Sequence, residues 1–293
     1  MPTRKEQLAR RNTLNDLSGG EWLQFTKTWF TCDSRRYHRN RNTELHPARF
    51  PEEMVTDFLR FFTKRDGWVL DPFAGSGATL VACAEQGRRG VAVELAERYV
   101  EVMRLRVGLE QPPQTVLAGD AREIASPAFW DAARAELATA GLPFADGLPV
   151  FDFSISSPPY GAMLHTSRGG VYSKQKQRAD KGLDTVYSLD PRDVGNIAEY
   201  PAFVAELGRI YRGVGRLLKP RGYLVVVAQN FRAPDGEVYP LPWDLTRELS
   251  SELSFQGERI WCQNSKPLGI WGYPNTFVPN YHHHYCLIFR VRP

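Results

Sequence analysis

The chain has 293 residues, of which 42% are hydrophobic, and a formal net charge of +4, a composition typical of a globular protein with one large or two ordinary domains. No apolar run approaches the roughly 20 residues needed to span a bilayer, and the polar, basic N-terminus lacks the hydrophobic stretch of a secretory signal. Four scattered cysteines without a CxxC pair argue against a zinc site or a disulfide framework. These features predict a cytoplasmic protein without a membrane or metal partner.

Strand-like apolar runs alternate with helical patterns along most of the chain. In chain order, we expect a strand at 67–73, a helix at 77–87, a strand at 88–95, a helix at 96–110, a strand at 114–120, a helix within 126–149, a strand at 150–156, a helix at 200–220, a strand at 222–230, a helix at 242–253, and closing strands at 255–264 and 282–291. This order predicts an α/β fold with a mostly parallel seven-stranded sheet, an antiparallel edge strand and helices on both faces.

Basic charge is concentrated in two segments of the chain. Residues 1–50 hold ten Lys and Arg against five Asp and Glu, and residues 161–182 hold five against one. The remainder is mildly acidic. The pattern fits either two solvated segments or a surface that binds a polyanion.

A glycine loop, "DPFAGSGATL" at 71–80, joins the first predicted strand to the first helix. Gly75 and Gly77 permit a tight turn and a close approach of the backbone to a ligand, although the spacing is neither that of dinucleotide enzymes nor that of a P-loop. Glu94 ends the second strand, where an acid can bind ribose hydroxyls, and Asp120 ends the third, where a carboxylate can accept from an adenine amino group. Each feature alone fits a turn or a helix cap, but together on consecutive strands they predict a nucleotide-type pocket.

The fourth predicted strand ends in an unusual stretch, "SISSPPYGAML" at 154–164. Two prolines have no N–H to donate, so the ladder stops there, and Ser156 is expected to be the last strand residue. The Ser157 hydroxyl and the Pro158 carbonyl can accept hydrogen bonds from an aromatic amine, and Tyr160 offers a flat face on which a base can stack, worth about 1–3 kcal/mol. Alone the stretch fits a Pro-Pro turn, but ligand sites in open α/β sheets lie at such strand ends.

These motifs resemble those of a known family. "DPFAGSG", "VAVEL" and "AGDA" are similar to the cofactor half of S-adenosyl-L-methionine-dependent methyltransferases, and "SPPY" resembles the catalytic motif of amino-methyltransferases that act on exocyclic nitrogens. "HPARFPEEM" at 46–54 resembles the segment that helps to close the cofactor pocket, and "HHHYCLIFR" at 282–290 resembles the closing hairpin. The resemblance spans about residues 20–292 and implies a Rossmann-like methyltransferase fold.

The resemblance also implies a cofactor and site residues. The cofactor is S-adenosyl-L-methionine. The implied catalytic residues are Ser157, Pro158, Pro159 and Tyr160. The implied cofactor-binding residues are His46, Pro47, Asp71, Pro72, Phe73, Gly75, Ser76, Gly77, Glu94, Leu95, Asp120 and Ala121.

The reaction that the resemblance implies is methyl transfer to the N4 amine of cytosine in duplex DNA, with the target base flipped out of the helix. The serine of "SPPY" favours cytosine N4, since adenine-N6 enzymes more often carry an acid there. The motif order, cofactor segment first, is the reverse of that in many cytosine-N4 enzymes. Adenine-N6 methylation, RNA amine methylation and a non-catalytic binding scaffold stay open as alternatives, as does a companion restriction endonuclease.

We expect residues 1–45 to form a basic N-terminal arm and residues 46–293 to form the methyltransferase domain, with 161–196 a basic insertion that contacts DNA. The predicted nucleic-acid-binding residues are Arg39, Arg41, Arg168, Lys174, Lys176 and Arg178. A second DNA-contact segment is 262–281, whose amides can pair with base edges and whose aromatic residues can wedge or stack. The histidines at 282–284 alternate faces along a strand, so a hairpin at the sheet edge is favoured over a metal site.

Overall fold

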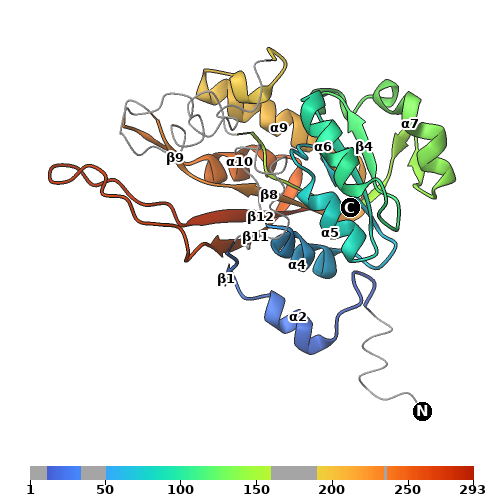
Figure 1. Ribbon diagram of the computed structural model, residues 1–293, viewed down its shortest axis with the longest axis horizontal. Helices are drawn as coiled ribbons and strands as arrows, with labels where there is room; N and C mark the ends of the chain where they lie inside the picture. The colour runs from blue at the N-terminus through green and yellow to red at the C-terminus, as the bar shows by residue number, and fades with distance from the viewer. Residues whose placement is uncertain (1–11, 34–50, 160–189, 234–235) are drawn as a thin grey trace.

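The computed structural model describes residues 12–33, 51–159, 190–233 and 236–293 of the chain (Figure 1). The helices and helical turns are α2 (Gly19–Phe25), α4 (Glu52–Phe62), α5 (Ala78–Glu85), α6 (Glu97–Val107), η1 (Ala121–Glu123), α7 (Pro127–Thr139), η3 (Val194–Asn196), α9 (Tyr200–Arg216) and α10 (Leu241–Leu249). The strands of the main sheet are β1 (Trp29–Thr31), β2 (Trp68–Asp71), β3 (Arg89–Glu94), β4 (Thr115–Ala118), β7 (Phe151–Ser156), β8 (Leu218–Ala228), β11 (Leu253–Cys262) and β12 (His283–Val291). Two short hairpins are formed by β5 (Phe144–Ala145) with β6 (Leu148–Pro149) and by β9 (Phe231–Arg232) with β10 (Val238–Tyr239).

The main sheet has eight strands in the order β1-β11-β12-β8-β7-β2-β3-β4. Its pairings are parallel except for those of β12, which runs antiparallel to both of its neighbours. This is the predicted Rossmann-like arrangement, and all seven predicted strands are present. Two details differ from the prediction. β1 adds an eighth strand, and the antiparallel strand lies inside the sheet because β11 and β1 continue the sheet beyond it.

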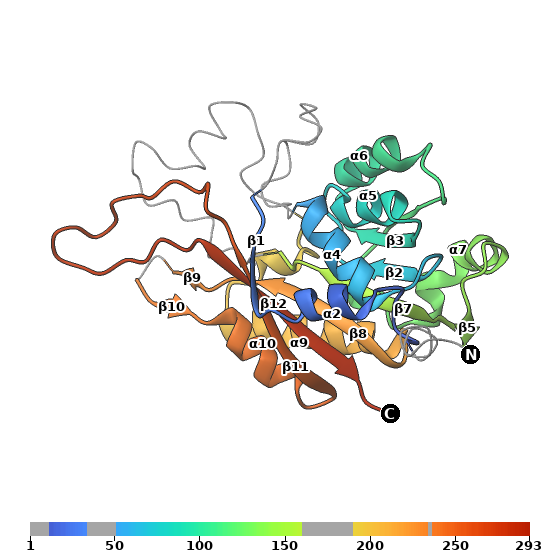
Figure 2. The ribbon, with the colours of Figure 1, turned by 90° about the horizontal axis from the view of Figure 1, so that it is seen from below.

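Helices cover both faces of the sheet, as predicted (Figure 2). The central strand β8 shows why, because successive side chains of a strand point to opposite faces. Val225 and Val227 pack with α4 and α5, whereas Leu224 and Val226 pack with α7, α9 and α10. Both α4 and α9 carry apolar side chains every three or four residues, so each helix buries one face against the strands.

The order of the strands determines where a ligand can bind. From β2 the chain proceeds to β3 and β4 on one side, and it then returns to β7 and β8 on the other side. The connection that follows β2 and the connection that follows β7 therefore run toward opposite sides of the sheet. This leaves a crevice at the carboxyl ends of these two strands.

The histidines at 282–284 lie at the start of β12, which is an interior strand and not the predicted edge. His284 stacks on Trp261 with ring centroids 4.6 Å apart, and burial lowers the pKa of His284 to about 3. Among the described residues no group of three or more His, Cys, Asp or Glu side chains is arranged to hold a metal ion. No disulfide joins any of the four cysteines, and no helix in the described part of the chain is long and apolar enough to cross a membrane.

Part of the predicted N-terminal arm belongs to the folded domain. β1 pairs in parallel with β11, and Phe25 at the end of α2 stacks on Phe61 of α4 with ring centroids 3.9 Å apart. The α2–β1 segment is held against the sheet by Arg259 of β11, whose side chain is only 6% exposed. Its guanidinium lies 4.0 Å from the Phe25 ring centroid and 4.4 Å from that of Phe30, and it donates to the Lys27 carbonyl. A buried cation between aromatic faces therefore joins residues far apart in sequence.

Replacement of Arg259 by alanine is expected to lower the free energy of unfolding by about 2–4 kcal/mol, because it removes the buried cation and the packing of its stem. Burial raises the pKa of Asp57, and the positive charge of Arg259 counteracts this rise. The replacement therefore also removes a cation that stabilises the Asp57 carboxylate. Urea denaturation measures the loss, and limited proteolysis is expected to cleave the α2–β1 segment first.

The matched control is Arg247→Ala, which removes an arginine that is 83% exposed and paired only across one helix turn with Asp244. Its effect is expected to stay within about 0.5 kcal/mol. Equal losses in the two variants would show that the aromatic contacts of Arg259 contribute nothing.

Candidate active site

A pocket opens at the carboxyl ends of β2, β3, β4 and β7, and it contains about 840 Å³ of empty space when its open mouth is counted. Ten of the residues predicted from sequence line this one cavity: Pro72, Phe73, Gly75, Ser76, Glu94, Leu95, Asp120, Ala121, Ser157 and Pro159. The predicted site residues His46, Pro47 and Tyr160 lie outside the described residues, as do the predicted nucleic-acid-binding residues Arg39, Arg41, Arg168, Lys174, Lys176 and Arg178.

The glycine loop between β2 and α5 forms one wall of the pocket, and Asp71 fixes it from behind. Asp71 is 1% exposed and does not line the pocket. Its carboxylate accepts from the Phe73 N–H at 3.1 Å and from the Thr79 hydroxyl at 2.5 Å, and burial raises its pKa to about 7. Asp71 thus shapes the loop instead of presenting an oxygen to the cavity.

Gly77 also supports the pocket from outside. It has a φ of 81° at the start of α5, and a Cβ at this position would lie 2.7 Å from Cγ of Met103. Glycine is therefore required both by the backbone and by the close approach of α6. Arg106 of α6 donates to the Ser76 carbonyl and pairs with Glu52 of α4 at 2.8 Å, so two helices together hold the loop.

Glu94 occupies the end of β3 and faces the pocket. One carboxylate oxygen accepts from the Gly75 N–H at 2.8 Å and the other from the Ala96 N–H at 2.9 Å. Each oxygen keeps a second lone pair that can accept from a ligand hydroxyl. Burial raises the Glu94 pKa to about 7, and the negative charges of Asp193 and Asp71 contribute in the same direction.

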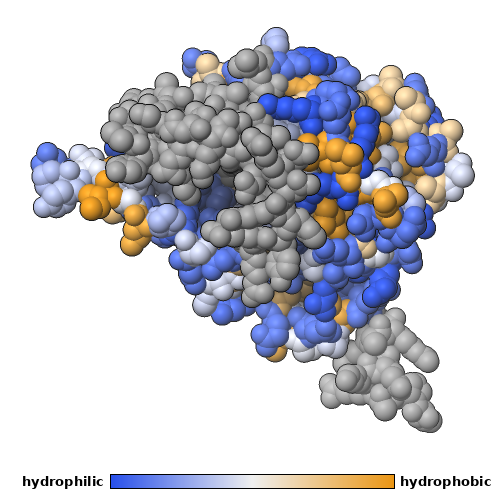
Figure 3. Space-filling model, viewed as in Figure 1, coloured by the Kyte–Doolittle hydropathy of each residue, from blue (hydrophilic) through white to orange (hydrophobic). Residues whose placement is uncertain are grey.

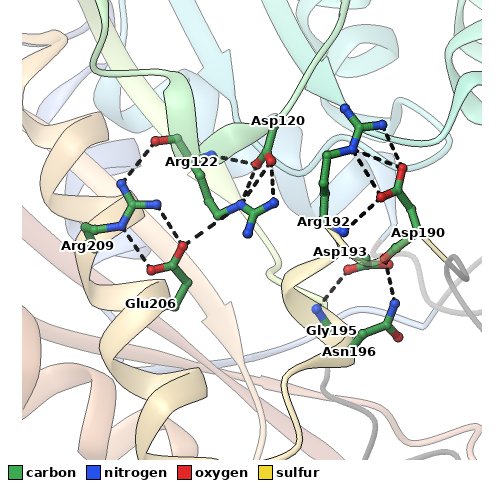
Figure 4. Close-up of polar contacts among 9 residues, drawn as sticks. All are labelled: Asp120, Arg122, Asp190, Arg192, Asp193, Gly195, Asn196, Glu206 and Arg209. Carbon is green, nitrogen blue, oxygen red and sulfur yellow. Dashed lines mark hydrogen bonds and ion pairs between the residues drawn. The ribbon is translucent and has the colours of Figure 1, made fainter.

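Asp120 ends the β4 segment, but its carboxylate is already engaged. Oδ2 accepts from Nη2 of Arg122 at 2.6 Å, and Oδ1 accepts from the Arg122 backbone N–H at 2.9 Å (Figure 4). Arg122 lies 4.0 Å from Glu206, which pairs with Arg209 of α9. The sequence suggested a carboxylate open to an adenine amino group; the structure instead fixes this carboxylate in a network with most of its acceptor sites occupied.

The "SPPY" corner closes the far side of the pocket. Ser156 is the last residue of β7, as predicted, and its buried hydroxyl hydrogen-bonds the Tyr211 hydroxyl at 2.9 Å. The next serine differs, because the Ser157 hydroxyl donates to the Val227 carbonyl of β8 at 3.1 Å. A carbonyl can only accept, so this contact uses the single hydroxyl proton and leaves the Ser157 oxygen as an acceptor toward the cavity. Ser157 and Pro159 line the pocket, whereas Pro158 lies buried behind them.

Sequence reasoning missed three pocket residues at the carboxyl end of the predicted insertion: Arg192, Asp193 and Val194. Asp193 caps η3 by accepting from the Gly195 N–H at 2.8 Å. Arg192 pairs with Asp190 through Nη2 and Oδ2 at 2.7 Å, and its backbone N–H also contacts that carboxylate (Figure 4).

A sequence signal for these residues did exist. Asp120 with Arg122 and Asp190 with Arg192 share an Asp-x-Arg spacing, and both pairs make the same contacts beside the pocket. Tyr99 and Gly119, which also line the cavity, carried no comparable signal.

Parts of the chain are similar to known DNA methyltransferases. A family model described as DNA methylase matches residues 3–104, a range that contains the glycine loop and Glu94. The type II methyltransferase M.ScaI of Streptomyces caespitosus is 39% identical over 57 residues, which is 20% of this chain and 19% of the relative. The type II methyltransferase M.SmaI of Serratia marcescens is 40% identical over 78 residues, which is 25% of this chain and 27% of the relative.

About a third of this chain is therefore similar to the DNA methylase family model, and short stretches are similar to type II methyltransferases. The matches span about a fifth and about a quarter of the length of these two relatives, so the reaction, substrate and partners of the whole protein are matters for proposal. Among solved structures, TrmN from Thermus thermophilus has a TM-score of 0.49 at 17% identity, covering 88% of this chain and 53% of that chain. The fold of this chain is defined by its own strand order.

Proposed function

We propose that this protein transfers a methyl group from S-adenosyl-L-methionine to an exocyclic amine of a base in DNA, and that the amine is N4 of cytosine. The observation that supports the proposal is the single cavity in which the glycine loop and Glu94 face Ser157 and Pro159. The residues proposed to bind the nucleoside and the residue proposed to hold the amine line the same space.

The residues of the pocket fit the nucleoside part of this cofactor. Gly75 has a φ of 52°, so the loop backbone turns without a side chain in the way, and the Glu94 carboxylate offers lone pairs to ribose hydroxyls. A Cβ at Gly119 would lie 2.6 Å from the Phe129 ring, so only glycine fits at this part of the wall. When bound, the cofactor would supply an electrophilic methyl group on a sulfonium that leaves as a neutral thioether, and the amine would lose one proton to water or to the Ser157 oxygen.

Ser157 is the residue that would hold the amine. Because its proton is donated to the Val227 carbonyl, its oxygen can accept a hydrogen bond from an amine N–H. This contact draws the amine nitrogen out of conjugation with the ring and directs its lone pair into the cavity. The Pro158 carbonyl is the second proposed acceptor, and the proline rings fix the backbone before the base arrives.

A serine in this position supports cytosine over adenine. Ser157 provides one neutral acceptor, whereas an acid would provide a charged carboxylate with two. The alternative targets are N6 of adenine and an amine of RNA, and the same experiment distinguishes them from N4 of cytosine.

Expression of the protein in cells that lack DNA modification, followed by single-molecule sequencing and by mass spectrometry of nucleosides, tests the proposal. We expect N4-methylcytosine in one sequence context. N6-methyladenine would overturn the choice of base while keeping the reaction, and methylated RNA with unmodified DNA would overturn the substrate. The absence of any modification, together with no transfer from labelled cofactor by the purified protein, would overturn the activity itself.

The variant Ser157→Ala is expected to reduce the rate of methyl transfer on the order of 100-fold, because the preorganised acceptor for the amine is lost. Cofactor affinity should change little, since Ser157 stands opposite the glycine loop. Single-turnover transfer from labelled cofactor gives the rate, and calorimetry gives the affinity.

The control for this variant is Ser154→Ala, on the same strand. The Ser154 hydroxyl is fully buried and has no hydrogen-bond partner among the described residues, so its removal should leave both quantities near wild type. If Ser157→Ala lost cofactor binding and transfer in equal measure, the amine site would have to lie elsewhere.

The affinity for S-adenosyl-L-methionine is expected to depend on the ionisation of Glu94. Its pKa is raised to about 7, so the carboxyl is protonated below that pH and loses acceptor capacity. Affinity should therefore fall as the pH is lowered through 7, by about tenfold per pH unit below it.

The matched variant is Glu94→Gln, which cannot ionise. It should bind about tenfold more weakly than wild type above neutral pH, and its affinity should vary less with pH over the same range. Isothermal titration calorimetry across the range measures both. Identical pH profiles for the two proteins would show that another group controls the affinity.

A further inference from the structure

The loop between β11 and β12, residues 263–282, projects from the body of the protein as a long arm (Figures 1 and 2). It carries a cluster of exposed apolar side chains that includes Ile270 and Phe277, both 86% exposed, and Tyr273, which is 82% exposed. Leu268 and Trp271 extend the cluster. Figure 3 shows strongly hydrophobic residues of the arm in orange, among paler and more hydrophilic ones.

The arm has a defined shape despite its exposure. The Asn280 side chain bridges its two limbs, accepting from the Gly269 N–H at 2.9 Å and donating to the Gly269 carbonyl at 2.9 Å. The Trp271 indole also donates to Asn280. A tight turn at the tip is closed by the Thr276 N–H and the Gly272 carbonyl at 2.7 Å. The apolar side chains are thus held in solvent by the arm itself.

The arm leaves the sheet at the edge where the pocket opens. β11 runs in the same direction as β7 and β2, so its carboxyl end lies at their carboxyl ends. The base of the arm is fixed to β8, because Gln229 donates to the His283 carbonyl at 2.6 Å. Gln229 lies two residues after Val227, whose carbonyl accepts the hydrogen bond from the Ser157 hydroxyl. The arm and the amine-holding corner are therefore attached to the same end of one strand.

The charge of the arm favours a polyanion. Residues 263–282 contain Lys266 and no Asp or Glu. Arg232 of β9 donates to the Phe277 carbonyl, which adds a second cation beside the outer part of the arm, whereas a neighbouring carboxylate, that of Asp33, accepts from Ser265 at the base of the arm. Exposed apolar area is disfavoured by roughly 25 cal/mol per Å² unless a partner covers it, and the stacked bases of DNA offer apolar faces bordered by phosphates.

We propose that this arm enters a groove of duplex DNA and inserts apolar side chains at the tip, Tyr273 and Phe277 foremost, between base pairs next to the target base. Such wedges unstack a base step and kink the duplex. A base cannot react inside the stack, so a wedge in a duplex bound at this end of the sheet lowers the energy needed to flip it out. The inference rests on the proposed function in that it takes DNA as the partner.

The test compares wild type with the double variant Tyr273→Ala/Phe277→Ala on a short duplex that carries the sequence context found in cells, or on random-sequence duplex if none is found. Energy transfer between dyes at the two ends of the duplex reports kinking and requires no methylation. We expect wild type to raise the transfer efficiency and the double variant to lose the increase. The control is Leu109→Ala, a residue 98% exposed after α6, which should behave as wild type.

Methyl transfer provides the second readout. The double variant should transfer at least about tenfold more slowly than wild type to the matched duplex, since base–aromatic contacts of this kind are worth that much. A mismatch at the target base removes most of the cost of flipping, so it should restore the rate of the variant. A purely structural defect would slow transfer to both duplexes equally.

The outcomes separate the two proposals. Kinking and matched-duplex transfer at wild-type levels in the double variant would overturn the wedge, as would an equal loss on matched and mismatched duplexes. A wild-type dimer in sedimentation that the double variant loses, with unchanged kinking and transfer, would assign the arm to self-association. Arm-dependent kinking by a wild-type protein that methylates nothing would overturn the proposed function and leave the arm as a DNA wedge.

Discussion

The site depends on one buried carboxylate. Asp71 closes β2 and holds the next turn through the Phe73 N–H and the Thr79 hydroxyl, which sets both the start of α5 and the path of the glycine loop. The loop in turn brings the Gly75 N–H to Glu94, so the orientation of the pocket acid follows from the loop. Burial raises the pKa of both carboxyl groups to about 7. The folded state therefore binds more protons at these positions than the unfolded chain, and these two groups stabilise the fold less as the pH rises from about 4.5 toward 7.

The second half of the site follows from parallel pairing. β7 and β8 run side by side to the same edge, so Ser157, one residue beyond β7, reaches the Val227 carbonyl near the end of β8. This contact converts a hydroxyl that can donate or accept into one that presents only lone pairs. The same strand end anchors the arm through Gln229. A single strand thus links the corner proposed to hold the base with the surface proposed to displace it from the stack.

Local patterns were sufficient to predict much of this arrangement. All seven predicted strands, the glycine loop and the strand-end position of Glu94 follow from alternation, turn residues and apolar periodicity, which act over short distances in sequence. β1 was missed because three residues are too short to show a period, and its place depends on Arg259, which lies more than 200 residues away. The interior place of β12 likewise depends on pairing partners that no local pattern reveals. Asp120 was predicted as an open acceptor because Arg122, two residues on, was not recognised as its partner.

The Asp-x-Arg pairs show how the two halves of the cavity are joined. Asp120 with Arg122 follows β4, and Asp190 with Arg192 lies at the carboxyl end of the predicted insertion that follows "SPPY". Each pair satisfies its own charges, so neither brings an uncompensated arginine to the pocket wall. Asp193 caps η3 beside Pro159 and also raises the pKa of Glu94 through its charge. The returning chain therefore connects the corner proposed for the amine electrostatically to the acid proposed for the ribose, and a displacement of η3 would change the pKa of Glu94 on the opposite wall.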